Sequence, residues 1–168
     1  MKIAVLSDSH IGQRITGFPP GFIQQLHDFD AIIHCGDFTS PLAVEQLREA
    51  ANFNAVAGNM DESIIKRQLP DTLAVELEGF NIGITHGWGA PNKLEFRVLE
   101  ALKTKYPHQQ FNIILFGHSH KPLDKTIDGV RMINPGSFSG NNFSSYGSWG
   151  ILTLSEGNIN FELKQIEV

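Results

Sequence analysis

Cysteine is almost missing from this chain of 168 residues. The single cysteine, Cys35, excludes an intramolecular disulfide and a zinc site built from several thiolates. Disulfides form and persist in oxidising compartments, so a chain that has none is expected in a reducing one, and we expect a cytoplasmic protein.

Long hydrophobic runs and an excess of positive charge are also lacking. No apolar run approaches the roughly 18 residues of a membrane-spanning helix, and residues 1–6 are typical of a first strand rather than a signal peptide. With 13 Lys+Arg against 18 Asp+Glu, the formal net charge is −5. We therefore expect no membrane association and no strong binding to nucleic acid, whose phosphates attract basic surfaces.

Linkers, low-complexity segments and repeats of a fixed period are missing as well. Hydrophobic residues make up 41% of the chain and charged residues 18%, which is typical of globular proteins rather than disordered ones. At this length a single domain over residues 1–168 is expected.

The chain begins as an alternation of apolar runs and amphipathic stretches. Strands are predicted over residues 3–6, 31–35 and 54–57, and helices over 21–28 and 40–51. Strands that are apolar throughout and alternate with helices indicate a parallel sheet covered on both faces.

Hairpin patterns dominate the rest of the chain. The predicted elements are strands over 72–78 and 80–85, a helix over 91–105, a buried strand over 111–116, and a hairpin of 124–127 and 130–133. Together with the first part, these elements predict an α/β fold with two mixed sheets.

Polar residues follow one predicted strand after another at its carboxyl end. The motifs are Asp8-Ser9-His10, Gly36-Asp37, Gly58-Asn59-Met60-Asp61, His86-Gly87 and Gly117-His118-Ser119-His120. Because ligands of open α/β sheets bind outside the carboxyl ends of the strands, we expect these motifs to converge.

The donor types in these motifs indicate a site for two metal ions. Carboxylates, imidazoles and an amide without thiolates fit Mn, Fe, Co, Ni or Zn better than Ca or Mg. Asp37 is suited to bridge two ions, which can clamp a phosphoryl group and activate water. In an extended segment His118 and His120 project on the same side, so both are expected to face this cluster.

Each motif by itself also has a structural interpretation. Gly-Asp and Gly-Asn are usually turns, and an isolated Asp-x-His is common. His34 is interpreted as a hydrogen-bonded core histidine and Cys35 as a small buried hydrophobe. Four aromatic residues in a Gly/Ser-rich stretch are compatible with a substrate-stacking wall, although core packing or a subunit contact is favoured: Phe138, Phe143, Tyr146 and Trp149.

In their order along the chain, the five motifs resemble those of the calcineurin-like metallophosphoesterase superfamily. The chain length, Gly58-Asn59-Met60-Asp61 and Asn134-Pro135-Gly136-Ser137 are similar to the branch of small, single-domain YfcE-type phosphodiesterases. This resemblance implies a four-layer α/β/β/α sandwich of two mixed β-sheets flanked by helices, with two divalent metal ions at the strand ends.

The resemblance also implies two ligand sets that share Asp37. One set is Asp8, His10, Asp37 and His120, and the other is Asp37, Asn59, His86 and His118. Mn is the expected metal, with Fe, Ni, Co or Zn as alternatives. The implied activity is hydrolysis of small phosphodiesters by a metal-bridging hydroxide, with Asp37, Asn59 and His86 as catalytic residues.

Two departures from the family pattern affect this expectation. Many members have histidine after the Gly-Asn asparagine, where this chain has Met60, so the general acid is unidentified. Asp61 is a candidate for it, with a turn residue or helix N-cap as the alternative. Residues 139–142 lack the basic residue that related proteins often have, so no phosphate-binding arginine is inferred in that loop.

Other functions are compatible with the same fold. A phosphomonoesterase and a dinucleoside polyphosphate hydrolase are enzymatic alternatives, and the small subunit of the retromer coat resembles this fold as a protein-interaction scaffold. Every expected ligand position is filled, which favours an enzyme whose partner is a small phosphoester. A homo-oligomer is left open.

Overall fold

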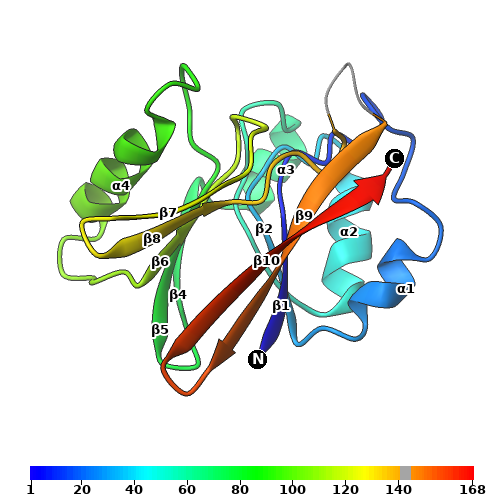
Figure 1. Cartoon of the computed structure of the whole chain (residues 1–168). Coiled ribbons are helices and arrows are strands. Elements are labelled where there is room, and N and C mark those ends of the chain that lie inside the picture. Colours follow the sequence, from blue (N-terminus) through cyan, green and yellow to red (C-terminus); the bar gives the residue numbers. More distant parts are fainter. Residues whose placement is uncertain (141–144) are drawn as a thin grey trace.

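Two five-stranded β-sheets form the centre of the molecule, with helices on their outer faces (Figure 1). The computed structural model describes residues 1–140 and 145–168. Its elements are β1 (Lys2–Leu6), α1 (Phe22–Leu26), β2 (Ala31–His34), α2 (Pro41–Ala50), β3 (Asn52–Ala55), α3 (Ser63–Gln68), β4 (Thr72–Leu77), β5 (Phe80–Thr85), α4 (Leu94–Lys105), β6 (Ile113–Leu115), β7 (Leu123–Ile127), β8 (Val130–Asn134), β9 (Tyr146–Ser155) and β10 (Asn158–Glu167).

The first sheet joins the two ends of the chain. Its strand order is β10-β9-β1-β2-β3, in which β1, β2 and β3 are parallel. β9 runs antiparallel to β1, with Lys2 opposite Thr153, and β10 completes the sheet through a hairpin. The amino-terminal strand therefore lies in the interior of this sheet.

The second sheet has the order β4-β5-β6-β8-β7. β5, β6 and β8 are parallel, whereas β4 and β7 pair antiparallel at the two edges. The hairpin turns at Glu78-Gly79 and Asp128-Gly129 have positive φ at both residues, which matches the right-handed twist of the strands that they join. Both hairpins predicted from the sequence are confirmed.

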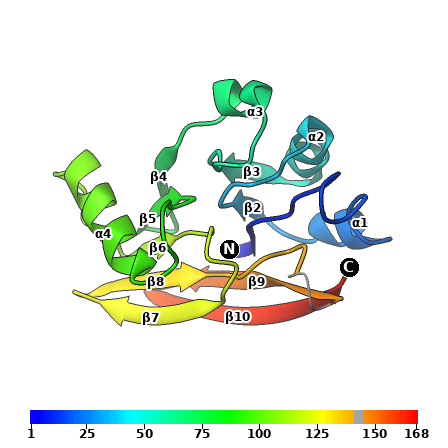
Figure 2. The ribbon, with the colours of Figure 1, turned by 90° about the horizontal axis from the view of Figure 1, so that it is seen from above.

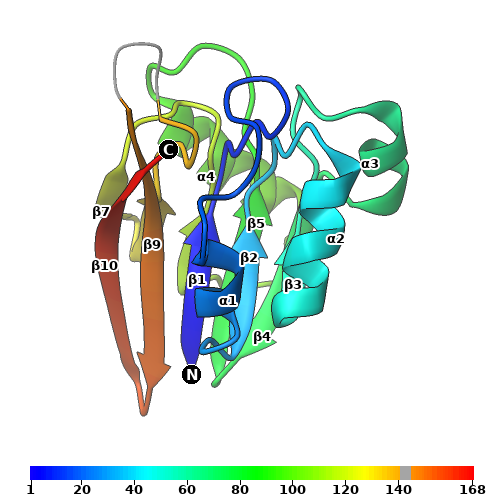
Figure 3. The ribbon, with the colours of Figure 1, turned by 90° about the vertical axis from the view of Figure 1, so that its right-hand side faces the viewer.

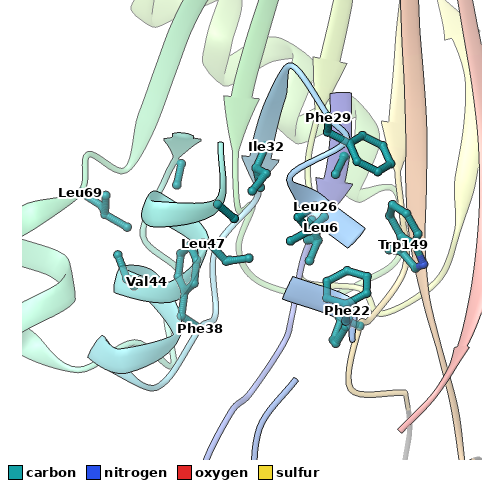
Figure 4. Close-up of a cluster of buried hydrophobic side chains, with 14 of the residues drawn as sticks. Leu6, Phe22, Leu26, Phe29, Ile32, Phe38, Val44, Leu47, Leu69 and Trp149 are labelled. Atoms are coloured by element: carbon teal, nitrogen blue, oxygen red, sulfur yellow. The ribbon is translucent and has the colours of Figure 1, made fainter. Parts of the chain in front are cut away.

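Alternation along the strands produces the four layers. Ile3 and Val5 of β1 pack between the two sheets, together with Ile82 and Ile113 of the second sheet. Ala4, which lies between Ile3 and Val5 in β1, points to the other face and belongs to a separate core beneath α1 and α2. Figure 4 shows several side chains of this core. Figure 3 shows α1 and α2 in front of β1, β2 and β3.

The helix α4 covers the opposite outer face. Its residues Leu94, Val98, Leu99 and Leu102 pack on Ile114 and Met132 and other residues of the second sheet. In the view of Figure 2, α4 lies on one side of the strands and α1 and α2 lie on the other. The α/β/β/α sandwich expected from the sequence is therefore confirmed.

The structure differs from the sequence prediction most clearly at β3, α4 and α3, and the bounds of several other elements shift by one to two residues. β3 begins at Asn52 and ends at Ala55, two residues earlier than predicted. α4 begins at Leu94 rather than Pro91, because Lys93 adopts a left-handed conformation with φ 55°. The short helix α3 was not predicted, since its six residues have too little length for a clear helical period.

The aromatic residues near the carboxyl end mostly pack in the core. Phe138 is fully buried and Trp149 nearly so, and both rings contact Phe22. Tyr146 is 54% exposed on β9, and Phe143 lies outside the described residues. The favoured interpretation, core packing, is confirmed for Phe138 and Trp149. Among the described residues, no helix is both long and apolar enough to cross a membrane.

Candidate metal centre

The five motifs converge at one edge of the sandwich. Asp8 and His10 follow β1, and Asp37 follows β2. The backbone N–H of Asp8 donates to the carbonyl of Gly36 over 3.0 Å, and that of His10 donates to the carbonyl of Asp37 over 3.1 Å. In Figure 3 the loops after β1 and β5 both lie at the top, beyond the carboxyl ends of these strands. The parallel strands thus bring together residues that are up to 112 positions apart.

The backbone at these ligand positions is strained. Five of the seven predicted ligands have positive φ although none is glycine: Asp8 (53°), His10 (44°), Asp37 (60°), His118 (69°) and His120 (57°). Left-handed backbone costs roughly 1–2 kcal/mol for a residue with a side chain, and such strain gathers at functional sites.

This conformation corrects the reason for expecting His118 and His120 at the site, although both histidines do face it. The segment after β6 is a tight bend rather than an extended strand, so the alternation of side chains along a strand does not apply. The two imidazoles instead face different neighbours, with His120 beside His10 and His118 beside His86. The structure therefore divides these histidines between two clusters.

The first cluster joins Asp8, His10 and His120. His120 Nε2 lies 3.0 Å from Asp8 Oδ1 and 3.4 Å from His10 Nε2. Asp8 Oδ2 accepts hydrogen bonds from the Ser7 hydroxyl and from the backbone N–H of His118. Asp8 Oδ1, by contrast, is one of two buried side-chain atoms without a hydrogen-bond partner in the described part of the chain. This oxygen is aimed at the two imidazoles and is free to bind a cation.

The second cluster joins Asp37, Asn59, His86 and His118. Asn59 Oδ1 lies 3.1 Å from His86 Nε2 and 3.0 Å from His118 Nδ1. His86 Nε2 is also 3.2 Å from Asp37 Oδ2. Two imidazole nitrogens and two oxygens therefore point at one place.

Bonds behind the rings determine which nitrogens face this cluster. His86 Nδ1 donates to the carbonyl of Cys35 over 2.8 Å, and His118 Nε2 donates to the carbonyl of Gly89 over 2.8 Å. Since a carbonyl can only accept, each of these nitrogens carries the proton. The lone pairs of neutral His86 and His118 therefore face Asn59 and Asp37, which is the arrangement that metal-binding histidines adopt.

Asp37 connects the two clusters through one oxygen. Its Oδ2 lies 3.2 Å from His86 Nε2 and 3.8 Å from His10 Nε2. Its Oδ1 points away and accepts the backbone N–H of Met60 over 2.7 Å. This geometry suits a carboxylate shared by two ions.

The spacing and chemistry of the donors fit two divalent ions. Ligands about 2.0–2.2 Å from one ion lie roughly 3.0–3.5 Å apart, and most of the distances within each cluster fall in this range. Without a cation, lone pairs would face one another in both clusters. The orphaned Asp8 Oδ1 is a further sign that a cation belongs here.

The local charges shift the pKa values of these groups. Burial raises the pKa of Asp8, but the imidazole of His120 3.0 Å away, the charge of His86 and the Ser7 hydroxyl outweigh burial and lower it to about 2. Burial lowers the pKa of His86, but the hydrogen bond to Asp37 and the charge of Asp8 raise it to about 9. The two carboxylates therefore favour a proton on His86 when no cation is bound there.

Two glycines allow the strand ends to approach this closely. Gly36 has φ 92°, and a Cβ atom there would lie 2.9 Å from His86 Nδ1. A Cβ atom on Gly58 would collide with Asp37 Oδ1 and with the backbone of Asp37. The Gly-Asp and Gly-Asn motifs thus serve close packing of loops around the ligands as well as turns.

Asp61 stabilises this loop packing through hydrogen bonds to backbone N–H groups. Its Oδ1 accepts the N–H of Thr39 over 2.8 Å, and its Oδ2 accepts the N–H groups of Gly58 and Asp37 over 2.7 and 3.1 Å. The carboxylate is buried and does not cap α3, whose N-cap is Glu62. This geometry favours the structural alternative, in a loop rather than at a helix end.

Met60 and His34 differ in their exposure to solvent. The Met60 side chain is 49% exposed at the rim of the site. His34 is fully buried, accepts the N–H of Gly36 at Nδ1 over 3.1 Å, and lies 3.0 Å from the Ser9 hydroxyl. Its prediction as a hydrogen-bonded core histidine is confirmed, as is the burial of Cys35.

Arg14 is a site residue that the sequence did not reveal. Its Nη1 lies 3.3 Å from His120 Nδ1 and donates to the carbonyl of Gly140 over 3.3 Å. It follows His10 by four positions in a loop without regular structure, so no periodic pattern could place its side chain. Lys66 is a second such cation, since its ammonium donates to the carbonyl of Asn59 over 2.8 Å.

Comparisons with known proteins find relatives that share this fold. The solution structure of a Thermotoga maritima protein is 36% identical, has a TM-score of 0.77, and is matched over 98% of this chain and 99% of the other. A phosphodiesterase of Methanocaldococcus jannaschii is 27% identical over 157 residues, which cover 83% of this chain and 86% of the relative.

Similarity also extends to a protein named for sorting rather than hydrolysis. Vacuolar protein sorting-associated protein 29 of Schizosaccharomyces pombe is 31% identical over 144 residues, which cover 83% of this chain and 73% of the relative. The model of the calcineurin-like phosphoesterase superfamily domain matches residues 1–157, which include every ligand described above. This match covers β1 to β9 and both clusters, and the chain therefore belongs to the calcineurin-like phosphoesterase superfamily.

Proposed function

We propose that this protein is a phosphodiesterase that hydrolyses small phosphodiesters and depends on two divalent transition-metal ions, with Mn as the preferred metal. The observation that carries the proposal is the position of Asp37 Oδ2 between two sets of converging donors. A single carboxylate oxygen in this position gives two ions a fixed separation, as catalysis at a two-metal centre requires.

The ions would be held by the two clusters, in the ligand sets expected from the sequence. When bound, they supply positive charge that clamps a phosphoryl group and lowers the pKa of water. The side chains of the protein contribute orientation. Cys35 and Gly89 fix the rings of His86 and His118 through their carbonyls, and Asp61 fixes the loops that carry Asp37 and Asn59. Asp61 acts here as a positioning residue.

Arg14 is suited to bind a phosphate oxygen beside the first cluster. When His120 Nε2 serves as a ligand, the proton of the neutral ring sits on Nδ1, which then cannot accept from Arg14. The guanidinium keeps its bond to the Gly140 carbonyl and can offer its other N–H groups to the substrate. Arg14 thus supplies the positive charge that residues 139–142 lack. Arg14→Ala is expected to raise KM more than Arg14→Lys does.

Met60 favours diesters over monoesters as substrates. Its thioether can neither donate a proton nor bind an anionic oxygen strongly. A monoester carries more negative charge than a diester, and a thioether offers nothing to stabilise that additional charge. The similarity to the Methanocaldococcus jannaschii phosphodiesterase supports the same choice.

The test is a panel of phosphodiesters and phosphomonoesters, measured on chelator-treated protein with Mn, Fe, Co, Ni, Zn or no ion. We expect no turnover without metal, recovery with Mn, and faster reaction of diesters. Full turnover after verified removal of metal would contradict the proposal, and faster reaction of monoesters would contradict the substrate class.

The alternative function, a protein-interaction scaffold, predicts no turnover of phosphoesters. The likeness to a vacuolar protein sorting-associated protein supports it, but a scaffold needs no converging lone pairs at its strand ends. Metal binding without turnover on any phosphoester of the panel would favour the scaffold.

A further inference from the structure

A cavity of about 320 Å³ opens directly beside the second cluster. Two of the predicted ligands, Asn59 and His86, line it on one side, together with the adjoining Gly58 and Gly87. Its other walls include Lys66 of α3, Asp71 and Thr72 at the start of β4, and Trp88 after β5. A group attached to a phosphate at the second cluster therefore has this cavity next to it.

Trp88 gives the cavity an aromatic wall. The residue is 49% exposed, although a tryptophan of the core would be buried. A single exposed aromatic residue is ordinary on a protein surface, so its exposure alone shows nothing. What distinguishes Trp88 is that it borders a cavity shared with two metal ligands.

The loop that carries Trp88 is also held in place. Arg97 of α4 donates to the carbonyls of Trp88 over 3.1 Å and of Asn92 over 2.8 Å, and to that of Ala90 as well. The carbonyl of Gly89 accepts from His118. The backbone beneath the indole is thus fixed at both the helix and the metal ligand, and a ligand that stacks on it pays little ordering entropy.

Polar groups lie at the edge of the same cavity. The ammonium of Lys66 donates to the carbonyl of Asn59, and both residues line the cavity. The exposed carboxylate of Asp71 can accept hydrogen bonds from the edge of a ring. A flat aromatic face with polar groups at the edges fits a planar ring better than a flexible aliphatic chain.

We infer that this cavity binds a planar aromatic ring, an aryl group or nucleobase, carried by one ester arm of the phosphodiester, and that Trp88 stacks on it. The inference rests on the proposed function, because that function places the phosphate at the neighbouring ions. It makes Trp88 a specificity-determining residue outside the metal centre.

The experiment compares phenylphosphonate with methylphosphonate, whose P–C bonds resist hydrolysis, by calorimetric titration of the Mn-loaded protein. Wild type is expected to bind phenylphosphonate about tenfold more tightly, as one stacking contact with a ring would give. In Trp88→Ala the preference should fall to about twofold or less, whereas Trp88→Phe should keep most of it.

Phe96→Ala is the matched control. Phe96 is also 49% exposed, but it lies on α4 and lines a different cavity with Leu99 and Lys103. This variant should show the wild-type preference. Equal affinities for the two phosphonates in wild type, or an unchanged preference in Trp88→Ala, would overturn the inference.

Hydrolysis of methyl 4-nitrophenyl phosphate with Mn, measured separately on wild type, separates the two proposals. Turnover without a phenyl preference would refute the ring-binding cavity and leave the phosphodiesterase intact. A phenyl preference that Trp88→Ala removes, without turnover of any phosphoester, would support the cavity and refute the enzyme.

Discussion

Asp37 uses its two oxygens for different purposes. Oδ1 is held by the N–H of Met60, so Oδ2 has a fixed position between His86 and His10. Burial raises the pKa of Asp37, but its hydrogen bond to His86 and the charge of that ring outweigh burial and lower it. Asp37 is therefore charged over the physiological pH range and can offset part of the positive charge of both ions.

Asp37→Asn should abolish turnover and leave the fold intact. An amide keeps the hydrogen bond to Met60 through its oxygen, but it has no charge with which to hold two cations together. The loss should exceed the roughly 10–100-fold that removal of an outer-shell partner costs. Turnover and metal content are measured beside a circular dichroism spectrum. Wild-type turnover in the metal-loaded variant would show that Asp37 does not bridge.

In the proposed reaction, Met60 is expected to affect how the rate depends on the leaving group. With a thioether at this half-exposed position, aryl diesters with acidic leaving groups should react fastest. Met60→His should help poor leaving groups more than good ones, because general acid catalysis contributes roughly 10²–10⁴-fold where the leaving oxygen needs a proton. The slope of log rate against leaving-group pKa measures this, and an unchanged slope in Met60→His would refute the role given to this position.

At the scale of the element, β2 carries a buried histidine that must stay neutral. Burial lowers the pKa of His34 to about 3, below its ordinary value of 6.5. The unfolded chain therefore binds a proton below pH 6.5 that the folded chain does not bind until near pH 3. The contribution of His34 to stability is complete above pH 6.5 and is lost as the pH falls from there towards 3.

His34→Gln should remove this pH dependence. Between pH 7.5 and 5.5 the free energy of unfolding should fall by about 1.4 kcal/mol more in wild type than in the variant, since one pH unit below the unfolded pKa costs that amount. Urea unfolding at both pH values measures the difference. A parallel loss in both proteins would mean that His34 titrates normally in the folded state.

The conformation of the loop between β5 and α4 depends on hydrogen bonds from Arg97. Its guanidinium holds three carbonyls of this loop, and the Gly89 carbonyl between them orients His118. Arg97→Gln should weaken metal binding at the second cluster by less than the roughly 10–100-fold of a direct outer-shell partner, and should spare the first cluster. Calorimetric metal titration checks this, with Arg67→Gln on the exposed side of α3 as control. Equal weakening at both clusters would argue for general loosening.

At the scale of the whole molecule, the two mixed sheets and the gathering of the motifs could be predicted because both follow from local patterns, whereas the four-layer sandwich was implied by the resemblance to the family. Each motif ends an apolar run, and parallel strands bring their carboxyl ends to one edge. The pairing of β9 with β1 joins residues about 150 positions apart and has no local signal. The bend at His118 and His120 depends on a left-handed backbone that the extended pattern did not show.

The individual side chains that reach the site from outside the motifs could not be placed from the sequence. Arg14 and Trp88 owe their places to loop conformation and to bonds such as those of Arg97, and Lys66 reaches the Asn59 carbonyl from the short helix α3, which has no clear period. The ligand sets were expected from the resemblance of the motifs to the family, in which metal chemistry restricts the residue types, whereas a substrate pocket accepts many. The substrate class is therefore the part that the sequence predicts least, and it stays a proposal.

The most direct test of the two-metal account is anomalous diffraction from crystals of the Mn-loaded protein. The account predicts two Mn peaks on either side of Asp37 Oδ2, about 3.5–4 Å apart. Asn59, His86 and His118 should surround one peak, and Asp8, His10 and His120 the other. A single peak, or peaks that do not share Asp37, would contradict it.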